Sequence, residues 1–114
     1  MGKVYFTLTG TKHYYGKESL KPGMKLLLEK EPDNEYDKEA IMVKLEGLGK
    51  LGYVANSPYT VLGDSLSAGR LYDRIGKKAY GKVILVTPQG VLCKVNKKSL
   101  VVYQKKEAIE NGSE

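Results

Sequence analysis

The sequence is poor in the residue types that small domains use for crosslinks, metal sites and membrane spans. It has one cysteine, Cys93, one histidine, His13, and no tryptophan. A single cysteine excludes an internal disulfide and a cysteine-based zinc site, and a single histidine lacks a second histidine to complete a metal site. No apolar run approaches the roughly 20 residues that span a bilayer. We therefore expect no metal, no cofactor, no membrane contact, and a place in a reducing cytoplasm.

Charge is unevenly distributed along the 114 residues, whose net charge is +6. Residues 1–17 carry +3, residues 18–46 carry −3, and residues 47–106 carry +9, while the last eight residues contain three glutamates. A density of positive charge as high as that of residues 47–106 is typical of proteins that bind a polyanion. A solvated basic surface that only keeps the protein soluble explains the charge nearly as well.

Alternating apolar and polar residues predict a protein made mostly of short strands, separated by glycine and proline turns. The predicted strands are residues 3–9, 24–29, 40–46, 50–54, 80–87, 91–95 and 100–103. Closure of a sheet removes its exposed edges, so this pattern favours a small β-barrel of about six strands. Cys93 lies in one of these strands, where we expect an inert thiol.

One segment between the strands has helical spacing. Ser57-Pro58 is a good helix start, because serine caps the first turn and proline fits its first position. Gly63 and Gly69 argue against one uninterrupted helix, so we expect a two-helix insert whose halves meet near residues 64–67. We expect residues 1–106 to form a single domain and residues 107–114 to form a flexible acidic tail.

An acid-rich turn precedes the strand at residues 40–46. It contains Asp33, Asn34, Tyr36 and Asp37, and its proline and asparagine are turn formers. Binding groups often lie on such loops at the edge of a rigid scaffold. A turn whose acids serve only its own backbone is the structural alternative. The alternating acids also suggest a calcium loop, but Lys38 stands where such loops need glycine, and no helices flank it. A magnesium nuclease would need a second acidic strand, which the sequence does not supply.

Three blocks of the chain resemble the HIRAN domain family in their order and spacing. They are Gly10-Thr11-Lys12-His13-Tyr14-Tyr15-Gly16, the acidic turn followed by Ala40-Ile41-Met42-Val43, and Lys50-Leu51-Gly52-Tyr53-Val54. The resemblance runs from about Val4 to about Val95. It implies an OB- or SH3-like β-barrel that binds the 3′ end of single-stranded DNA without catalysis, in DNA repair or processing.

Relatives usually carry this domain ahead of a Swi/Snf-type helicase engine or beside nuclease domains. This chain has no Walker-type Gly-x-x-x-x-Gly-Lys motif. Any remodelling or cleavage would therefore come from a helicase or nuclease partner acting in trans, or this chain is a fragment of a longer protein. A barrel whose aromatic groove binds a peptide is the main alternative, and a metal-dependent nuclease is a further one.

The expected DNA contacts combine stacking rings, end-reading polar groups and cations. Tyr14 or Tyr15 would stack on bases, and Asn34 and Asp37 would read the terminal hydroxyl. A carboxylate accepts a hydrogen bond from a 3′-hydroxyl and repels a 3′-phosphate. Gly52 would let a sugar or base approach the backbone. The expected DNA-binding residues are His13, Tyr14, Tyr15, Asp33, Asn34, Tyr36, Asp37, Tyr53, Asn56, Arg70, Arg74, Lys77 and Lys78.

Each of these assignments has a structural alternative. The tyrosines could belong to the core, and the basic residues could form a solvated helix face. His13 departs from the stronger base that DNA-binding relatives often carry at this position, which predicts weaker or pH-dependent binding.

Overall fold

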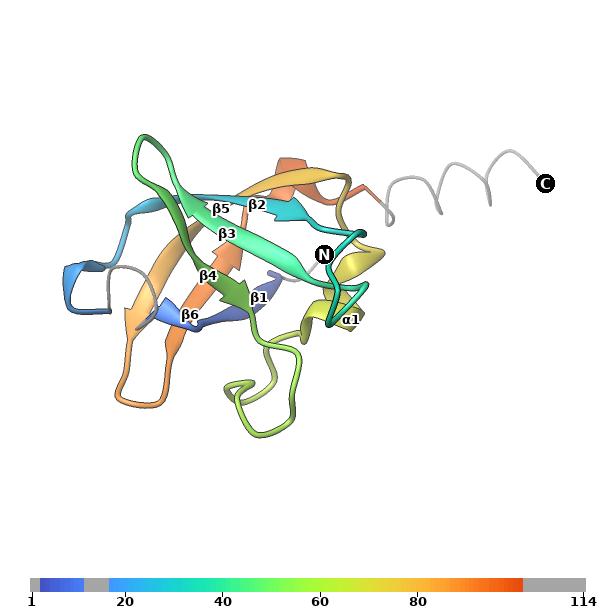
Figure 1. The fold of residues 1–114 in the computed structure, drawn as a ribbon. Coiled ribbons are helices and arrows are strands. Elements are labelled where there is room, and N and C mark those ends of the chain that lie inside the picture. The colour runs from blue at the N-terminus through green and yellow to red at the C-terminus, as the bar shows by residue number, and fades with distance from the viewer. Residues whose placement is uncertain (1–2, 12–16, 102–114) are drawn as a thin grey trace.

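The computed structural model describes residues 3–11 and 17–101. Within them, six antiparallel strands close into a barrel in the order β1-β4-β3-β2-β5-β6, and β6 pairs back with β1 (Figure 1). The strands are β1 (Tyr5–Thr9), β2 (Lys25–Lys30), β3 (Ile41–Leu45), β4 (Gly49–Val54), β5 (Lys78–Val86) and β6 (Val91–Val95). The prediction of a mostly β barrel of about six strands is confirmed.

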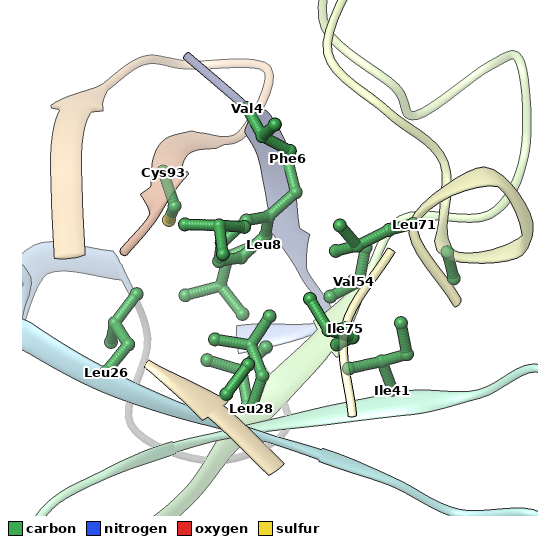
Figure 2. Packing of buried hydrophobic residues seen from close by; sticks show 14 of the residues in the cluster. Val4, Phe6, Leu8, Leu26, Leu28, Ile41, Val54, Leu71, Ile75 and Cys93 are labelled. Carbon is green, nitrogen blue, oxygen red and sulfur yellow. The ribbon is translucent and has the colours of Figure 1, made fainter. Parts of the chain in front are cut away.

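The barrel interior is filled by the apolar positions of the alternating strands. Phe6, Leu8, Leu28, Ile41 and Val83 are each at most 1% exposed. Figure 2 shows side chains from several strands pointing toward one another around Phe6 and Leu8. Burial of this apolar surface contributes roughly 25 cal/mol per Å², which makes the interior the main stabilising element.

Cys93 belongs to this interior. Its side chain is fully buried, and burial raises the pKa of its thiol to about 12. The thiol is therefore protonated at neutral pH, and it is neither reactive nor accessible.

Two glycine-dependent features shape the strand pairs. Gly47 and Gly49 have positive φ angles of 87° and 93°, which close the turn between β3 and β4. At Gly52, an added Cβ would overlap the carbonyl oxygen of Thr9 in the neighbouring strand β1. The space beside Gly52 is thus occupied by β1, so the expectation that a sugar or base approaches the backbone there is wrong.

The predicted two-helix insert is also wrong. Within the described residues, the insert contains one short helix, α1 (Ala68–Tyr72), which Ser67 caps by accepting a hydrogen bond from the Arg70 amide. A turn does start at Ser57, whose carbonyl accepts from the Thr60 and Val61 amides at 2.9 and 3.0 Å, but it does not continue.

The reason is that β1 takes the backbone groups that a helix would need. The Leu62 amide donates to the Thr7 hydroxyl at 3.0 Å, and the Leu66 amide donates to the Tyr5 carbonyl at 2.8 Å. The Thr7 and Ser65 hydroxyls also form a buried hydrogen bond of 2.9 Å. Gly63, with φ of 51°, turns the chain between these contacts. Tertiary bonds therefore hold this segment in an irregular path along β1.

The predicted strand at residues 100–103 is not formed in its described part. Leu100 follows the 3-10 turn η3 (Lys97–Ser99) and makes an isolated bridge to Ile75. A second 3-10 turn, η2 (Lys17–Ser19), precedes β2. The acidic tail at residues 107–114 lies outside the described residues. In the part of the chain that the structure describes, no helix is long and apolar enough to cross a membrane.

Candidate nucleic-acid interface

The acid-rich loop between β2 and β3 is organised around the Asn34 side chain. Its amide oxygen accepts from the backbone amides of Tyr36 and Asp37 at 2.8 and 3.0 Å, while its amide nitrogen donates to the Glu31 carboxylate at 3.1 Å. These contacts form a side-chain-mediated turn of the kind that asparagine favours. Asn34 thus shapes the loop, and this use of its amide is the structural alternative that the sequence left open.

Glu31 connects this loop to the wall of the barrel. The same carboxylate oxygen accepts from the Tyr53 hydroxyl at 2.8 Å, and that hydroxyl in turn accepts from the Lys50 ammonium at 3.1 Å. Partial burial is the main cause that raises the pKa of Tyr53, so its hydroxyl keeps its proton and remains a donor. Tyr53 therefore contributes to the position of the loop through Glu31.

Asp37 connects the loop to α1. One of its carboxylate oxygens accepts from the Glu39 amide at 2.9 Å, and the other accepts from the Asn56 side chain at 2.8 Å. The Asn56 oxygen accepts from the Gly69 amide in the first turn of α1 at 2.8 Å. Figure 1 shows the loop before β3 lying against α1, as these bonds require. Asp37 and Asn56, both predicted site residues, are brought together here.

Two exposed aromatic rings flank the Asp37–Asn56 hydrogen bond along the chain. Tyr36 is 94% exposed and directly precedes Asp37, whereas Tyr59 is 95% exposed and lies three residues after Asn56. Because both tyrosine rings are exposed to solvent, they add no stability to the fold through burial. Exposed rings of this kind are suited to stacking on nucleobases. Tyr59 was missed in the sequence because Ser57-Pro58 placed it inside a predicted helix. The turn-forming serine and proline before it were the available signal.

The predicted basic residues lie at and beyond α1. Arg70 is exposed on the helix, Arg74 follows it half-buried, and Lys77 and Lys78 are exposed at the start of β5. A further cation, Lys30, is turned inward. Its ammonium donates to the Ile75 carbonyl at 2.9 Å and lies 4.3 Å from the centre of the Tyr72 ring, and burial lowers its pKa.

The remaining predicted residues divide into two groups. Asp33 is exposed on the loop. His13, Tyr14 and Tyr15 lie outside the described residues, so their roles stay predictions. Among the residues that the structure describes, no group of three His, Cys, Asp or Glu side chains could hold a metal ion.

The acidic turn, the β3 strand that follows it and the glycine-containing β4 strand belong to one recurring pattern. The model of the HIRAN domain matches residues 1–89, which is most of the chain. The chain belongs to the HIRAN domain family. HIRAN domains are generally non-catalytic binding modules, and the family is known for binding DNA ends. No curated protein matches this sequence significantly.

Two solved structures share this HIRAN fold. A crystal structure of a protein from Lactobacillus plantarum is 26% identical, covers 82% of this chain and 93% of its own, and has a TM-score of 0.55. The crystal structure of the HIRAN domain of human HLTF is 17% identical, covers 86% of this chain and 79% of its own, and has a TM-score of 0.54. At this identity, the second similarity supports the fold alone.

The hydrogen bonds through which Asn56 connects the loop to α1 can be tested by the variant Asn56→Ala. Loss of the hydrogen bonds to Asp37 and Gly69 should cost about 1 kcal/mol locally, since each exposed bond contributes modestly. Amide hydrogen exchange at Gly69 should accelerate about fivefold. The Val95 amide, which donates to the Val4 carbonyl in the barrel wall, is the internal control and should not change. Equal acceleration at both amides would instead indicate a global loss of stability.

Proposed function

We propose that this HIRAN domain binds single-stranded DNA at its 3′-hydroxyl end, with the acidic loop as the part that reads the end. The observation that carries this proposal is the Asp37 carboxylate, which is held by hydrogen bonds from the Glu39 amide and the Asn56 side chain. Exposed tyrosines stand near both partners in the sequence, Tyr36 directly before Asp37 and Tyr59 three residues after Asn56. A free 3′-hydroxyl is a donor that internal phosphodiesters lack, and a carboxylate oxygen with a spare lone pair accepts from it. The flanking rings would stack on the last bases.

The charge of the loop supports end selectivity over general DNA affinity. Residues 31–39 contain five acids and one lysine. Such a loop repels phosphate groups, and the repulsion is greatest for a terminal phosphate, which carries more charge than an internal one. The loop can therefore select an end, while the attraction for the DNA backbone must come from cations elsewhere, such as Arg70 and Lys77.

The test is fluorescence-anisotropy binding of one short single strand with either a 3′-hydroxyl or a 3′-phosphate. We expect tighter binding of the hydroxyl end, and Asp37→Ala should lower that preference by about tenfold, since a hydrogen bond to a charged group contributes roughly 1.5–3 kcal/mol. Unchanged discrimination in Asp37→Ala would contradict the role of this carboxylate.

Two further variants separate the chemistry of Asp37 from its structural role. Glu35→Ala removes the same charge from an exposed position of the same loop, and it should keep the end preference. Asn56→Ala removes one of the two hydrogen bonds that hold the Asp37 carboxylate but keeps its charge, so it should lower the end preference less than Asp37→Ala does. A loss of preference in Glu35→Ala would mean that the loop acts through its total charge and not through Asp37.

A further inference from the structure

Three lysines stand in one row across the outer surface of the barrel. Lys25 of β2 is paired with Lys82 of β5, and Lys82 is paired with Lys94 of β6. All three point outward, because neighbouring residues on the same strands, such as Leu26 and Val83, are buried in the interior. The register of the closed barrel thus brings together three cations that lie far apart in the sequence.

This row is unfavourable for folding by itself. Side chains that lie directly opposite on paired strands have Cβ atoms roughly 5 Å apart, and like charges in such pairs destabilise a sheet. Within the described residues, no carboxylate forms an ion pair with any of the three lysines, whereas Lys44 on β3 does pair with Glu29. The row therefore concentrates positive potential at a cost, which is the property of a surface that binds an anion.

The row borders a hollow of about 760 Å³ with an exposed aromatic ring. Tyr80 is 60% exposed there, and its backbone is held on both sides: its amide donates to the Ser99 hydroxyl at 3.0 Å, and its carbonyl accepts from the Asn96 amide at 2.7 Å. The same bonds place η3 beside the ring. The charged and aromatic residues of the lining are Lys3, Lys25, Lys82, Lys94, Lys97 and Tyr80, with Glu46 as the acid.

We propose that this lysine face, defined by Lys25, Lys82, Lys94 and Tyr80, binds the backbone of single-stranded DNA independently of any strand end. The lysines would contact successive phosphates, and the Tyr80 ring would stack on an unpaired base. Strands lie about 4.8 Å apart, so the row spans about 10 Å, which exceeds a single phosphate and suits a polymer. A duplex hides the faces of its bases and would leave Tyr80 without a stacking partner.

The lysine face is separate from the acidic loop. Lys25 begins β2 and the loop follows Lys30 at its other end, so about 17 Å of strand lies between them. The two surfaces also differ in sign, since the loop is acidic and the face is basic. The face can therefore hold internal nucleotides where the loop would repel them, and its activity does not depend on the proposed reading of the 3′ end.

The test uses a closed circular single-stranded oligonucleotide, which has no 3′ end. The wild-type protein should bind it in a salt-dependent manner. The triple variant Lys25→Gln, Lys82→Gln, Lys94→Gln should lose at least about tenfold in affinity at low salt. Its plot of log affinity against log salt should be shallower by about 2, because each phosphate contact on a single strand contributes about 0.7. Tyr80→Ala should weaken binding roughly fivefold or more.

A matched variant and the linear strands distinguish a failure of the lysine face from a failure of the end-reading proposal. Lys38→Gln removes one cation from an exposed position on the acidic loop and should leave binding of the circle unchanged. If the circle does not bind while the linear 3′-hydroxyl strand does, the lysine face is refuted and the end-reading proposal stands. If the circle binds as expected but the two linear ends bind equally, only the end-reading proposal fails.

Two other results would overturn the lysine-face assignment. Equal affinity of the triple variant and the wild type for the circle would place the contacts elsewhere. A closed duplex dumbbell that binds as tightly as the circle, with no effect of Tyr80→Ala, would identify the ligand as duplex DNA. The circular dichroism spectrum of each variant should match the wild type, since the substituted side chains all point outward.

Discussion

Gly52→Ala should destabilise the barrel by about 3 kcal/mol, the upper end of the usual cost of overpacking. A Cβ at this position would overlap the carbonyl oxygen of Thr9 and would lie 3.2 Å from a methyl group of Leu8. The Thr9 carbonyl belongs to the backbone of β1 and cannot rotate away as a side-chain end would. Strand β1 must then move off β4, where Leu8 pairs with Val54 and Thr9 with Tyr53.

The measurement is the free energy of unfolding by urea titration, with Gly76→Ala as the matched control. Nothing lies closer than 4.0 Å to an added Cβ at Gly76, and its φ is not positive. That substitution should be neutral or slightly stabilising, because alanine reduces the entropy of the unfolded chain. Equal stability of the two variants would mean that β1 and β4 are not packed as closely as the structure has them.

Phe6→Ala should cost about 4 kcal/mol, within the range for removal of a buried aromatic ring. Phe6 is fully buried and lies at the centre of the interior shown in Figure 2. Its ring also reaches past β6 to β5, where an added Cβ at Gly81 would lie 3.4 Å from it. A closed barrel cannot collapse far around the missing ring, since its strands are joined on both sides. The part of the destabilisation that comes from the empty cavity should therefore remain nearly complete.

Thermal and urea unfolding of Phe6→Ala and Tyr36→Ala give the cleanest comparison. Both remove an aromatic ring, but Tyr36 is 94% exposed, so its loss should change stability by less than about 0.5 kcal/mol. With a total stability of roughly 5–15 kcal/mol for a small domain, the Phe6 variant should be markedly destabilised at 25 °C. A cost for Phe6→Ala as small as that for Tyr36→Ala would contradict its central place in the core.

Much of the barrel could be predicted from the sequence, because alternate residues of a strand point to opposite faces of the sheet. Strand β2 was predicted as a buried strand from its apolar run Leu26-Leu27-Leu28, and in the structure Leu26 and Leu28 are buried while Leu27 is half-buried. The turn at Gly47 and the loop around Asn34 were also found, because their conformations depend on residues close in the chain. The insert was misjudged, because its helical spacing is real but β1 takes the amides of Leu62 and Leu66.

The six barrel strands, the acidic loop and the family pattern followed from the amino-acid sequence, because these depend on neighbouring residues. Which distant groups meet depends on the folded arrangement of the strands. It tied Asp37 to Asn56 and Gly69, left Tyr59 exposed, and filled the space at Gly52 with β1. It also aligned lysines from three strands in one row, because the register between strands is fixed by the burial of their opposite faces.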